Sequence, residues 1–233
     1  NDYAKEIGNK VSGGTLIISE QQTKGKGRLG RVWKSKSGDG IWMSLIIKPK
    51  IEPYKAPFLT LVAGASVVKA LSNLGVEASI KWPNDIIVHN KKICGILTEL
   101  SAEMERVNYV VIGIGINIKT IDFPDEIKEK ATSLYKEGYK LSRVDIVRQF
   151  CIEFEKLYKG YILDGNKQDT LELCRKYSAI IGKQVYVIKN NKRELVKCID
   201  INENGNLIVK EKNGEIQEIM SGEVSIRGVK GYV

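Results

Sequence analysis

The stretch Lys24-Gly25-Lys26-Gly27-Arg28-Leu29-Gly30-Arg31-Val32-Trp33, continued by Lys34-Ser35-Lys36, is the part of the chain around which the rest is organised. These thirteen residues include six cations, three glycines and one tryptophan, with no Asp or Glu. Glycine allows backbone conformations and approach distances that a Cβ forbids, so backbone N–H groups can turn toward an anion while Lys and Arg neutralise it. The tryptophan adds a flat surface on which a planar group can lie. The composition therefore predicts an anion-binding loop.

This loop joins two predicted strands, residues 15–18 and 41–47, both rich in apolar and β-branched side chains. Residues 25–30 match the pattern G-x-G-x-x-G, which in dinucleotide-binding proteins follows a strand and opens directly into a helix. Here the chain runs on into another strand. We therefore set the dinucleotide-binding interpretation aside.

The net charge and the spacing of the cysteines limit the classes of function that this chain can have. The formal net charge of +9 favours anionic partners, and the loop contributes six of the positive charges; the alternative is a lysine-rich surface that only keeps the protein in solution. The cysteines Cys94, Cys151, Cys174 and Cys198 are far apart and form no CxxC pair. Neither a zinc site nor a disulfide framework is indicated. Three of the four lie in apolar-patterned segments, so we expect buried reduced thiols, which are typical of cytosolic proteins.

The sequence also bears on location. No unbroken apolar run approaches the roughly 18 residues that cross a bilayer, and the first residues have no signal-peptide pattern. These features predict a cytoplasmic protein without a membrane partner. The chain starts at Asn1 and not at methionine, which indicates that residues upstream of it have been lost.

The remaining segments predict an α+β fold. A tight turn at residues 90–92 between apolar runs indicates a mixed, largely antiparallel sheet, and the short alternating strands after Gly182 are typical of a small β-barrel. The expected helices are 1–6, capped by Asn1 or Asp2, 57–74, 142–164 with a capping box from Ser142 to Asp145, and 167–177. The expected strands are 15–18, 41–47, 78–82, 85–88, 92–100, 107–117, 184–189, 194–201, 207–211, 216–220 and 224–227. We expect two domains, residues 1–180 and 181–233.

A second unusual stretch, Lys81-Trp82-Pro83-Asn84-Asp85, places a cation, a tryptophan, a proline and a carboxylate between two predicted strands. Pro83 restricts the residue before it and interrupts the strand ladder, which fixes the direction of the neighbouring side chains. Asp85 is a candidate for holding a metal ion or for orienting a lysine. A plain strand-to-strand turn explains the stretch equally well.

Two further patterns suggest a pocket. Lys92 opens an apolar strand with Gly95 three residues later, and both can border a pocket if a ligand lies over the strand end, although Lys92 by itself is an ordinary turn lysine. Gly113 and Gly115 lie inside another apolar run and indicate close approach of a backbone or a ligand, with a β-bulge as the alternative. Asn117 offers both a donor and an acceptor for the edge of a base.

Together with Gly222-Glu223-Val224-Ser225-Ile226-Arg227, these stretches resemble, in the same order, the motifs of the biotin protein ligases. The resemblance covers essentially the whole chain. It implies a catalytic sheet covered by helices, like that of class II aminoacyl-tRNA synthetases, followed by a small SH3-like barrel. It also implies that ATP and Mg²⁺ convert biotin to biotinyl-5′-adenylate and pyrophosphate, and that the biotinyl group then passes to a lysine of a biotin carboxyl-carrier protein.

The resemblance also assigns roles to individual residues. Arg28 and Lys92 are implied to be catalytic, Asp85 to serve a metal or position Lys92, and Trp33 to stack on adenine as the loop closes as a lid. The implied biotin-binding residues are Asn1, Gln22, Gly25, Lys26, Gly27, Arg28, Lys92 and Gly95. The implied ATP-binding residues are Arg28, Arg31, Trp33, Asn84, Asp85, Lys92, Asn117 and Arg227.

This chain departs from the family pattern in two ways. Lys26 stands where arginine is frequent, which keeps the charge but loses the bidentate fork. The Ser-Thr pair of the family would precede Asn1, so part of the biotin site is expected to lie outside this sequence. We expect no specific DNA binding, because no helix-turn-helix precedes Asn1, and we expect a homodimer formed through exposed sheet edges.

Two other functions fit part of this pattern. A lipoate ligase shares the catalytic fold and the two-step chemistry. A nucleic-acid-binding module would use the basic glycine loop and Trp33 to follow a phosphate backbone.

Overall fold

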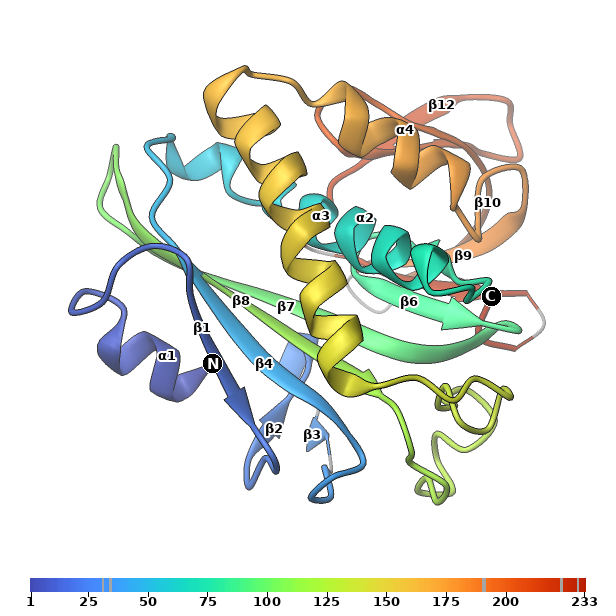
Figure 1. Cartoon of the computed structure of the whole chain (residues 1–233). Coiled ribbons are helices and arrows are strands. Elements are labelled where there is room, and N and C mark those ends of the chain that lie inside the picture. Colours follow the sequence, from blue (N-terminus) through green and yellow to red (C-terminus); the bar gives the residue numbers. More distant parts are fainter. Residues whose placement is uncertain (31, 34, 190–191, 223, 230) are drawn as a thin grey trace.

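The computed structural model describes residues 1–30, 32–33, 35–189, 192–222, 224–229 and 231–233. Its centre is a six-stranded sheet with the order β1-β4-β8-β7-β6-β5, in which every neighbouring pair is antiparallel (Figure 1). The strands are β1 (Thr15–Ser19), β4 (Gly40–Ile47), β5 (Ser79–Lys81), β6 (Asp85–Val88), β7 (Lys91–Ala102) and β8 (Val107–Asn117). The predicted sheet is confirmed, with strand ends shifted by one or two residues.

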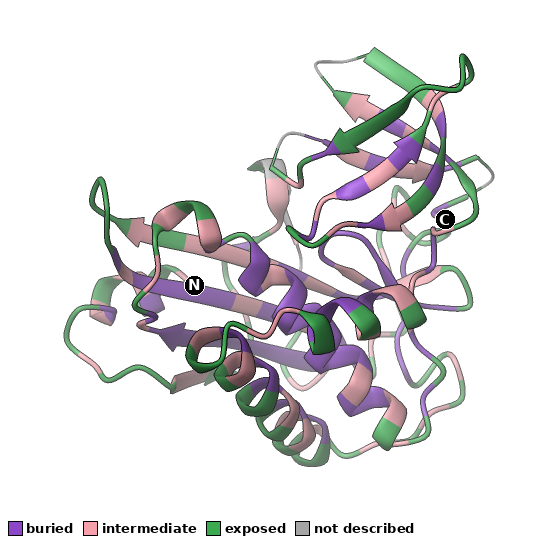
Figure 2. Ribbon diagram, turned by 90° about the horizontal axis from the view of Figure 1, so that it is seen from above, coloured by how far each residue is buried: buried purple, intermediate pink, exposed green. Residues whose placement is uncertain are grey.

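Helices cover one face of this sheet. The helices after β4 are α2 (Phe58–Asn73), α3 (Arg143–Leu163) and α4 (Gln168–Lys176). The small residues Ala63, Gly64 and Ala65 let α2 pack closely, and Gly75, with φ of +79°, follows its end. Figure 2 shows that most of the large sheet is buried, whereas the helices turn exposed faces outward. The helices predicted from apolar spacing are confirmed.

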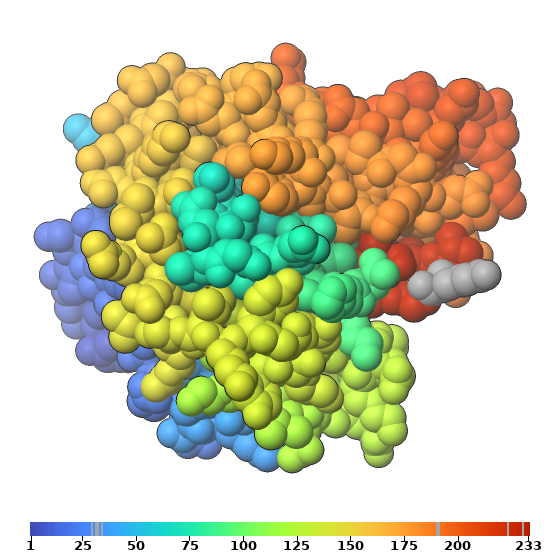
Figure 3. Space-filling view, turned by 45° about the vertical axis from the view of Figure 1, so that its right-hand side comes forward, coloured from blue at the N-terminus to red at the C-terminus, as the bar shows by residue number. Residues whose placement is uncertain are grey.

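One helical segment is apolar enough to resemble a membrane span. Pro53–Asn73 has a mean hydropathy of 1.2, but 72% of that stretch is buried inside the protein. Figure 3 shows only a small area of α2 at the surface, bordered by later parts of the chain. Polar residues such as Thr60 and Lys69 interrupt this segment, and its burial is that of a core helix, so it does not contradict the expectation drawn from the sequence.

The two faces of the sheet have different partners. In β4, Ile41, Met43 and Leu45 belong to the core under the helices. Ile46 points the other way, where it packs with Ala4 of the short helix α1 (Asp2–Ile7). This alternation is the two-residue period of a strand. It leaves the second face available for α1 and for the glycine loop.

Three local expectations need correction. The β6–β7 turn is His89-Asn90, with φ of 46° and 63°, one residue earlier than expected, because Val88 pairs with Lys91 and Asn tolerates left-handed backbone. Asn1 and Ser142 stand at N-cap positions but make no side-chain capping bond. The Asn1 amide is used elsewhere, and in the expected box of Ser142 the Asp is shorter than the usual Glu or Gln.

The last part of the chain forms a five-stranded antiparallel sheet with the order β12-β11-β10-β9-β13. Its strands are β9 (Gln184–Lys189), β10 (Lys192–Ile201), β11 (Leu207–Lys210), β12 (Ile216–Ile219) and β13 (Ser225–Gly228). It packs on the helical layer, where Arg175 of α4 donates to Asp200 and to the Ile201 carbonyl. The five strands predicted for the small barrel are confirmed and form this sheet; the boundary at residue 180 stays a prediction.

Candidate active site

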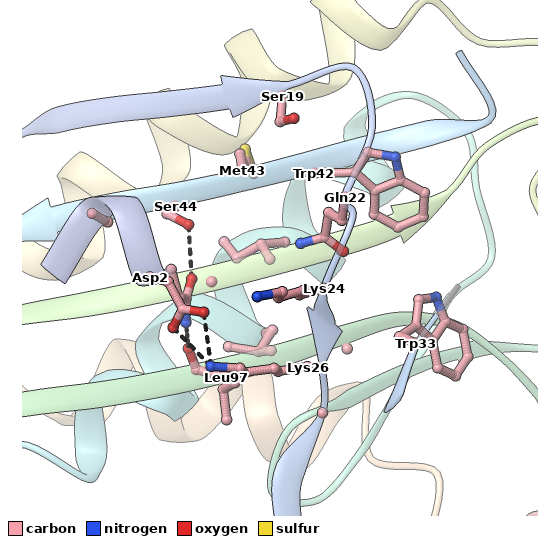
Figure 4. Close-up of a pocket in the computed structure, with 18 of the residues that line it drawn as sticks. Asp2, Ser19, Gln22, Lys24, Lys26, Trp33, Trp42, Met43, Ser44 and Leu97 are labelled. Carbon is pink, nitrogen blue, oxygen red and sulfur yellow. Dashed lines mark hydrogen bonds and ion pairs between the residues drawn. The ribbon is translucent and has the colours of Figure 1, made fainter. Parts of the chain in front are cut away.

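One row of cross-strand partners organises the open face of the large sheet. From β1 to β5 it contains Ser19, Trp42, Gly115, Gly95, Asp85 and Lys81. Direct cross-strand partners point to the same face of a sheet. Because two members in the middle are glycines, the row leaves a hollow between Trp42 and Asp85. A cavity of about 550 Å³ opens there, a size typical of small-molecule sites (Figure 4).

The glycines of β8 make room for side chains from other elements. A Cβ on Gly115 would lie 3.3 Å from the Trp42 ring, and a Cβ on Gly113 would lie 2.2 Å from Asn1 Oδ1. Strand pairing continues through both positions, with Gly115 opposite Gly95 and Gly113 opposite Leu97. Close approach, and not a β-bulge, explains these glycines.

Asn1 is held at one end of the cavity by three hydrogen bonds. Its Nδ2 donates to the Leu97 carbonyl (3.2 Å) and to Glu99 Oε2 (2.8 Å), and its Oδ1 accepts from Ser44 Oγ (2.7 Å). Burial raises the pKa of Glu99, but hydrogen bonds from Lys5 and Asn1 outweigh burial and hold that pKa below its usual value. Ser44 is not among the residues predicted from the sequence, although a polar residue in an apolar strand is a usable signal.

The glycine loop folds back on itself beside the cavity. Its strands β2 (Gly25–Lys26) and β3 (Val32–Trp33) pair Gly25 with Trp33, and a Cβ on Gly25 would lie 2.3 Å from the Trp33 carbonyl oxygen. Gly25 therefore serves loop packing and does not line the cavity. Lys26 lines it and forms an ion pair of 2.7 Å with Asp2, both labelled in Figure 4. Gln22 Oε1 accepts a hydrogen bond of 2.9 Å from Ser35.

Arg28 joins the loop to the rest of the site. It lies in the short 3-10 helix η1 (Arg28–Gly30), and Nη1 donates to Asn84 Oδ1 at 2.9 Å. Nη2 donates to the backbone carbonyls of Ser221 and Val224, which precede β13. The fork of one arginine therefore contacts both sheets at the cavity edge. Arg31 and Glu223 lie outside the described residues.

Lys92 and Asp85 form an ion pair that is largely shielded from solvent. Their side chains are 22% and 14% exposed and make an ion pair, so Lys92 is not an ordinary turn lysine. Burial raises the pKa of Asp85, but the charge of Lys92 and hydrogen bonds from Lys92 and Tyr232 outweigh burial and lower the pKa below its usual value. The Lys92 amine also lies 5.7 Å from the centroid of the Trp33 ring.

The contacts of Asp85 bear on its candidate metal role. One carboxylate oxygen pairs with Lys92 and the other accepts from the Tyr232 hydroxyl. Among the residues that the structure describes, no group of three or more His, Cys, Asp and Glu side chains is placed to hold a metal ion. Both carboxylate oxygens of Asp85 are therefore engaged within the protein, and the metal role stays a prediction. The observed contacts favour its other candidate role, orienting the lysine.

The structure brings most of the sequence-predicted site residues to one cavity. Those that line it are Asn1, Gln22, Lys26, Gly27, Arg28, Trp33, Asn84, Lys92, Gly95 and Asn117. Asn117 is buried, and its Nδ2 donates to the Thr132 carbonyl at 3.0 Å. Arg227 does not line the cavity; its guanidinium lies 6.0 Å from the Tyr232 ring centroid. Tyr232 and Lys81 were missed as site residues.

Comparison with known proteins agrees with this geometry. Residues 3–117 match the Biotin/lipoate A/B protein ligase family, and residues 180–227 match the Biotin protein ligase C terminal domain. The Bifunctional ligase/repressor BirA of Bacillus spizizenii is 40% identical over 222 residues, which cover 94% of this chain and 68% of that relative. The chain belongs to the biotin protein ligase family.

Solved structures of biotin protein ligases share the fold. The biotin protein ligase from Aquifex aeolicus in complex with biotin and ATP superposes with a TM-score of 0.83 at 30% identity, covering 96% of this chain and 94% of that one. The biotin acetyl coenzyme A carboxylase synthetase from Helicobacter pylori with bound biotinylated ATP gives a TM-score of 0.61 at 25% identity, covering 93% of each chain.

Proposed function

We propose that this biotin protein ligase activates biotin with ATP and then transfers the biotinyl group to a lysine of a biotin carboxyl-carrier protein. The observation that carries the proposal is the convergence of Arg28 and Lys92 on one cavity beside Gly95. Two similar proteins, those from A. aeolicus and H. pylori, are described with biotin and ATP or with biotinylated ATP.

The two steps require no protein nucleophile. In the first, a carboxylate oxygen of biotin bonds to the α-phosphorus of ATP as the bond to the bridging oxygen breaks, and pyrophosphate leaves. In the second, the acceptor amine attacks the acyl carbon, loses a proton and expels AMP. The first step brings two anions together, so positioning and preorganised positive charge supply the catalysis. Lys92 and Arg28 provide that charge in a partly buried site.

We assign the rest of the cavity by chemistry. Biotin lies over the part of the cross-strand row that contains its two glycines. Its site is bounded by Asn1, Gln22, Lys26, Gly27 and Gly95. Trp33 offers its ring to adenine and Asn117 reads the adenine edge, while Arg31 and Asn84 serve the phosphates. Arg227 approaches the nucleotide through the C-terminal sheet. Mg²⁺ bound to the ATP phosphates would neutralise their charge, and Asp85 acts by holding Lys92.

We also propose a cytoplasmic homodimer. The described cysteines are free thiols, which suits a reducing compartment. Strand β1 lies at one end of the sheet order and exposes 54% of Ile18, so it offers an edge for a second copy. Light scattering coupled to gel filtration tests the dimer, and a monomer at all concentrations would contradict it.

Pyrophosphate exchange into ATP tests the proposed activity. We expect exchange that depends on biotin and is absent with lipoate. Lipoate-dependent exchange would assign the chain to the related lipoate chemistry. A salt-dependent gel shift with nucleic acid, without exchange, would favour a nucleic-acid-binding module; against that reading, Lys26 and Arg28 already have partners in this chain, Asp2 and Asn84.

A further inference from the structure

Two side chains of the segment 81–85, which includes the turn between β5 and β6, reach out of the large sheet. Trp82 Nε1 donates to the Gly205 carbonyl at 2.9 Å, and Lys81 Nζ donates to the Tyr232 carbonyl at 2.6 Å. Two other polar residues of this segment, Asn84 and Asp85, hold Arg28 and Lys92. The segment therefore connects the C-terminal part of the chain to the cationic residues of the cavity.

Lys81 fixes Tyr232 in position. Its side chain is buried, with the whole residue only 2% exposed, and a buried ammonium must be compensated by nearby groups. Tyr232 supplies two of these: its carbonyl oxygen accepts the hydrogen bond, and its ring centroid lies 3.3 Å from Lys81 Nζ. The position of the Tyr232 ring thus follows from the burial of Lys81.

The fixed ring carries its hydroxyl to Asp85. Lys81 and Asp85 are direct partners across β5 and β6, so the ring that contacts the lysine also lies beside the carboxylate. The Tyr232 hydroxyl donates to Asp85 Oδ2, and Asp85 Oδ1 pairs with Lys92. Without this donor, the carboxylate has fewer contacts that determine its rotamer and hence the place of the Lys92 amine.

We propose that Tyr232 is a positioning residue, whose hydroxyl fixes the Asp85 carboxylate and through it the Lys92 amine for the adenylation step. This inference rests on the proposed function. It differs from a purely structural role because Lys81 contacts the carbonyl oxygen and the ring of Tyr232, and phenylalanine keeps both of these groups. The variant Tyr232→Phe therefore separates the two roles.

The experiment measures kcat and KM for biotin-dependent pyrophosphate exchange in the full chain. A hydrogen bond to a charged group is worth about 1.5–3 kcal/mol, so we expect Tyr232→Phe to lower kcat about tenfold or more and to leave both KM values within about twofold. Tyr161→Phe is the matched control, because that hydroxyl donates to the Lys55 carbonyl at 3.1 Å, and its kcat should stay near wild type.

A double-mutant cycle supplies the second readout. In the Asp85→Asn background, Tyr232→Phe should lower kcat by no more than about twofold, because the carboxylate through which it acts is gone. The inference would be overturned by an unchanged kcat in Tyr232→Phe, or by equal losses of kcat in the wild-type and Asp85→Asn backgrounds. In either case, biotin-dependent exchange by the wild type would still uphold the proposed function. A wild type without exchange would overturn both.

Discussion

The amine of Lys92 occupies the space where a side chain at residue 95 would begin. A Cβ on Gly95 would lie 2.9 Å from Lys92 Nζ and 3.0 Å from Lys92 Cε, closer than real Cβ atoms approach. The lysine lies over the glycine because it turns back toward Asp85, the cross-strand partner of Gly95. The three residues therefore form one unit, in which the small size of one permits the contact between the other two.

Substituting Gly95→Ala should disable that unit without unfolding the protein. The methyl group displaces the end of a flexible lysine, so we expect a drop in adenylate formation of at least tenfold and a change in unfolding free energy below about 1 kcal/mol. Gly64→Ala is the control, since its Cβ would lie 3.8 Å from Ile96 Cδ1, an ordinary contact. Wild-type exchange rates in Gly95→Ala would contradict the assigned position of Lys92.

Arg28→Ala should slow adenylate formation through loss of positive charge at the phosphates. Removal of one preorganised donor typically costs about 3–4 kcal/mol in the transition state, which predicts a rate loss of about 10²–10³-fold. Arg28→Lys should recover part of this rate, because it keeps the charge but not the two-armed contact with Asn84 and Ser221. Single-turnover kinetics measures both variants. Arg148→Ala, on the exposed face of α3, should remain at the wild-type rate.

The lowered pKa of Asp85 predicts acid sensitivity of the fold. A carboxyl whose pKa is lower in the folded than in the unfolded state stabilises the fold above its unfolded value of about 3.9, and this contribution is lost as pH falls toward the folded pKa. Urea unfolding between about pH 5 and pH 2 should therefore show a shallower loss of stability in Asp85→Asn than in the wild type. Asp125→Asn, in which an 89% exposed carboxylate is replaced, should keep the wild-type slope.

Trp33→Ala should weaken ATP binding more than biotin binding. Stacking of a base on an aromatic ring is worth about 1–3 kcal/mol, which predicts an increase of about 5–150-fold in the KM for ATP. Trp33→Phe should retain part of the effect, because it keeps an aromatic face. Steady-state kinetics with each substrate varied in turn measures the two KM values. An unchanged KM for ATP would show that adenine does not contact this ring.

Local sequence signals predicted most of the fold. These signals depend only on neighbours in the chain, so the predicted ends of strands and helices agree with the structure within one or two residues. Examples are the alternation in residues 107–117, the helical spacing in 57–74 and the turn at Asn90. The prediction that the glycine loop joins two strands was also confirmed. This placement argues against the dinucleotide-binding interpretation.

The contacts of the site depend on packing that the sequence does not display. Gly113 looked like a bulge or a ligand contact, and only the fold places Asn1 against it. Nothing near Tyr232 in the sequence indicates that its hydroxyl meets Asp85, 147 residues earlier. The sequence marks Lys81 only as the cation of an unusual stretch, and it does not show that this lysine is buried with its amine on the Tyr232 carbonyl. Such contacts join segments that are far apart in the sequence. Residues of the same types are common elsewhere in the chain, so residue type alone does not identify the contacts.

Mass spectrometry tests most directly whether this site activates biotin. The full chain is incubated with biotin, ATP and Mg²⁺, and the products are identified. We predict biotinyl-5′-adenylate and pyrophosphate with the wild type, and a large loss of both with a folded Lys92→Ala variant. Adding a biotin carboxyl-carrier domain should then convert the adenylate to AMP and a biotinylated lysine. A folded wild type that forms no biotinyl-adenylate, or a Lys92→Ala variant that forms it at the wild-type rate, would contradict this account.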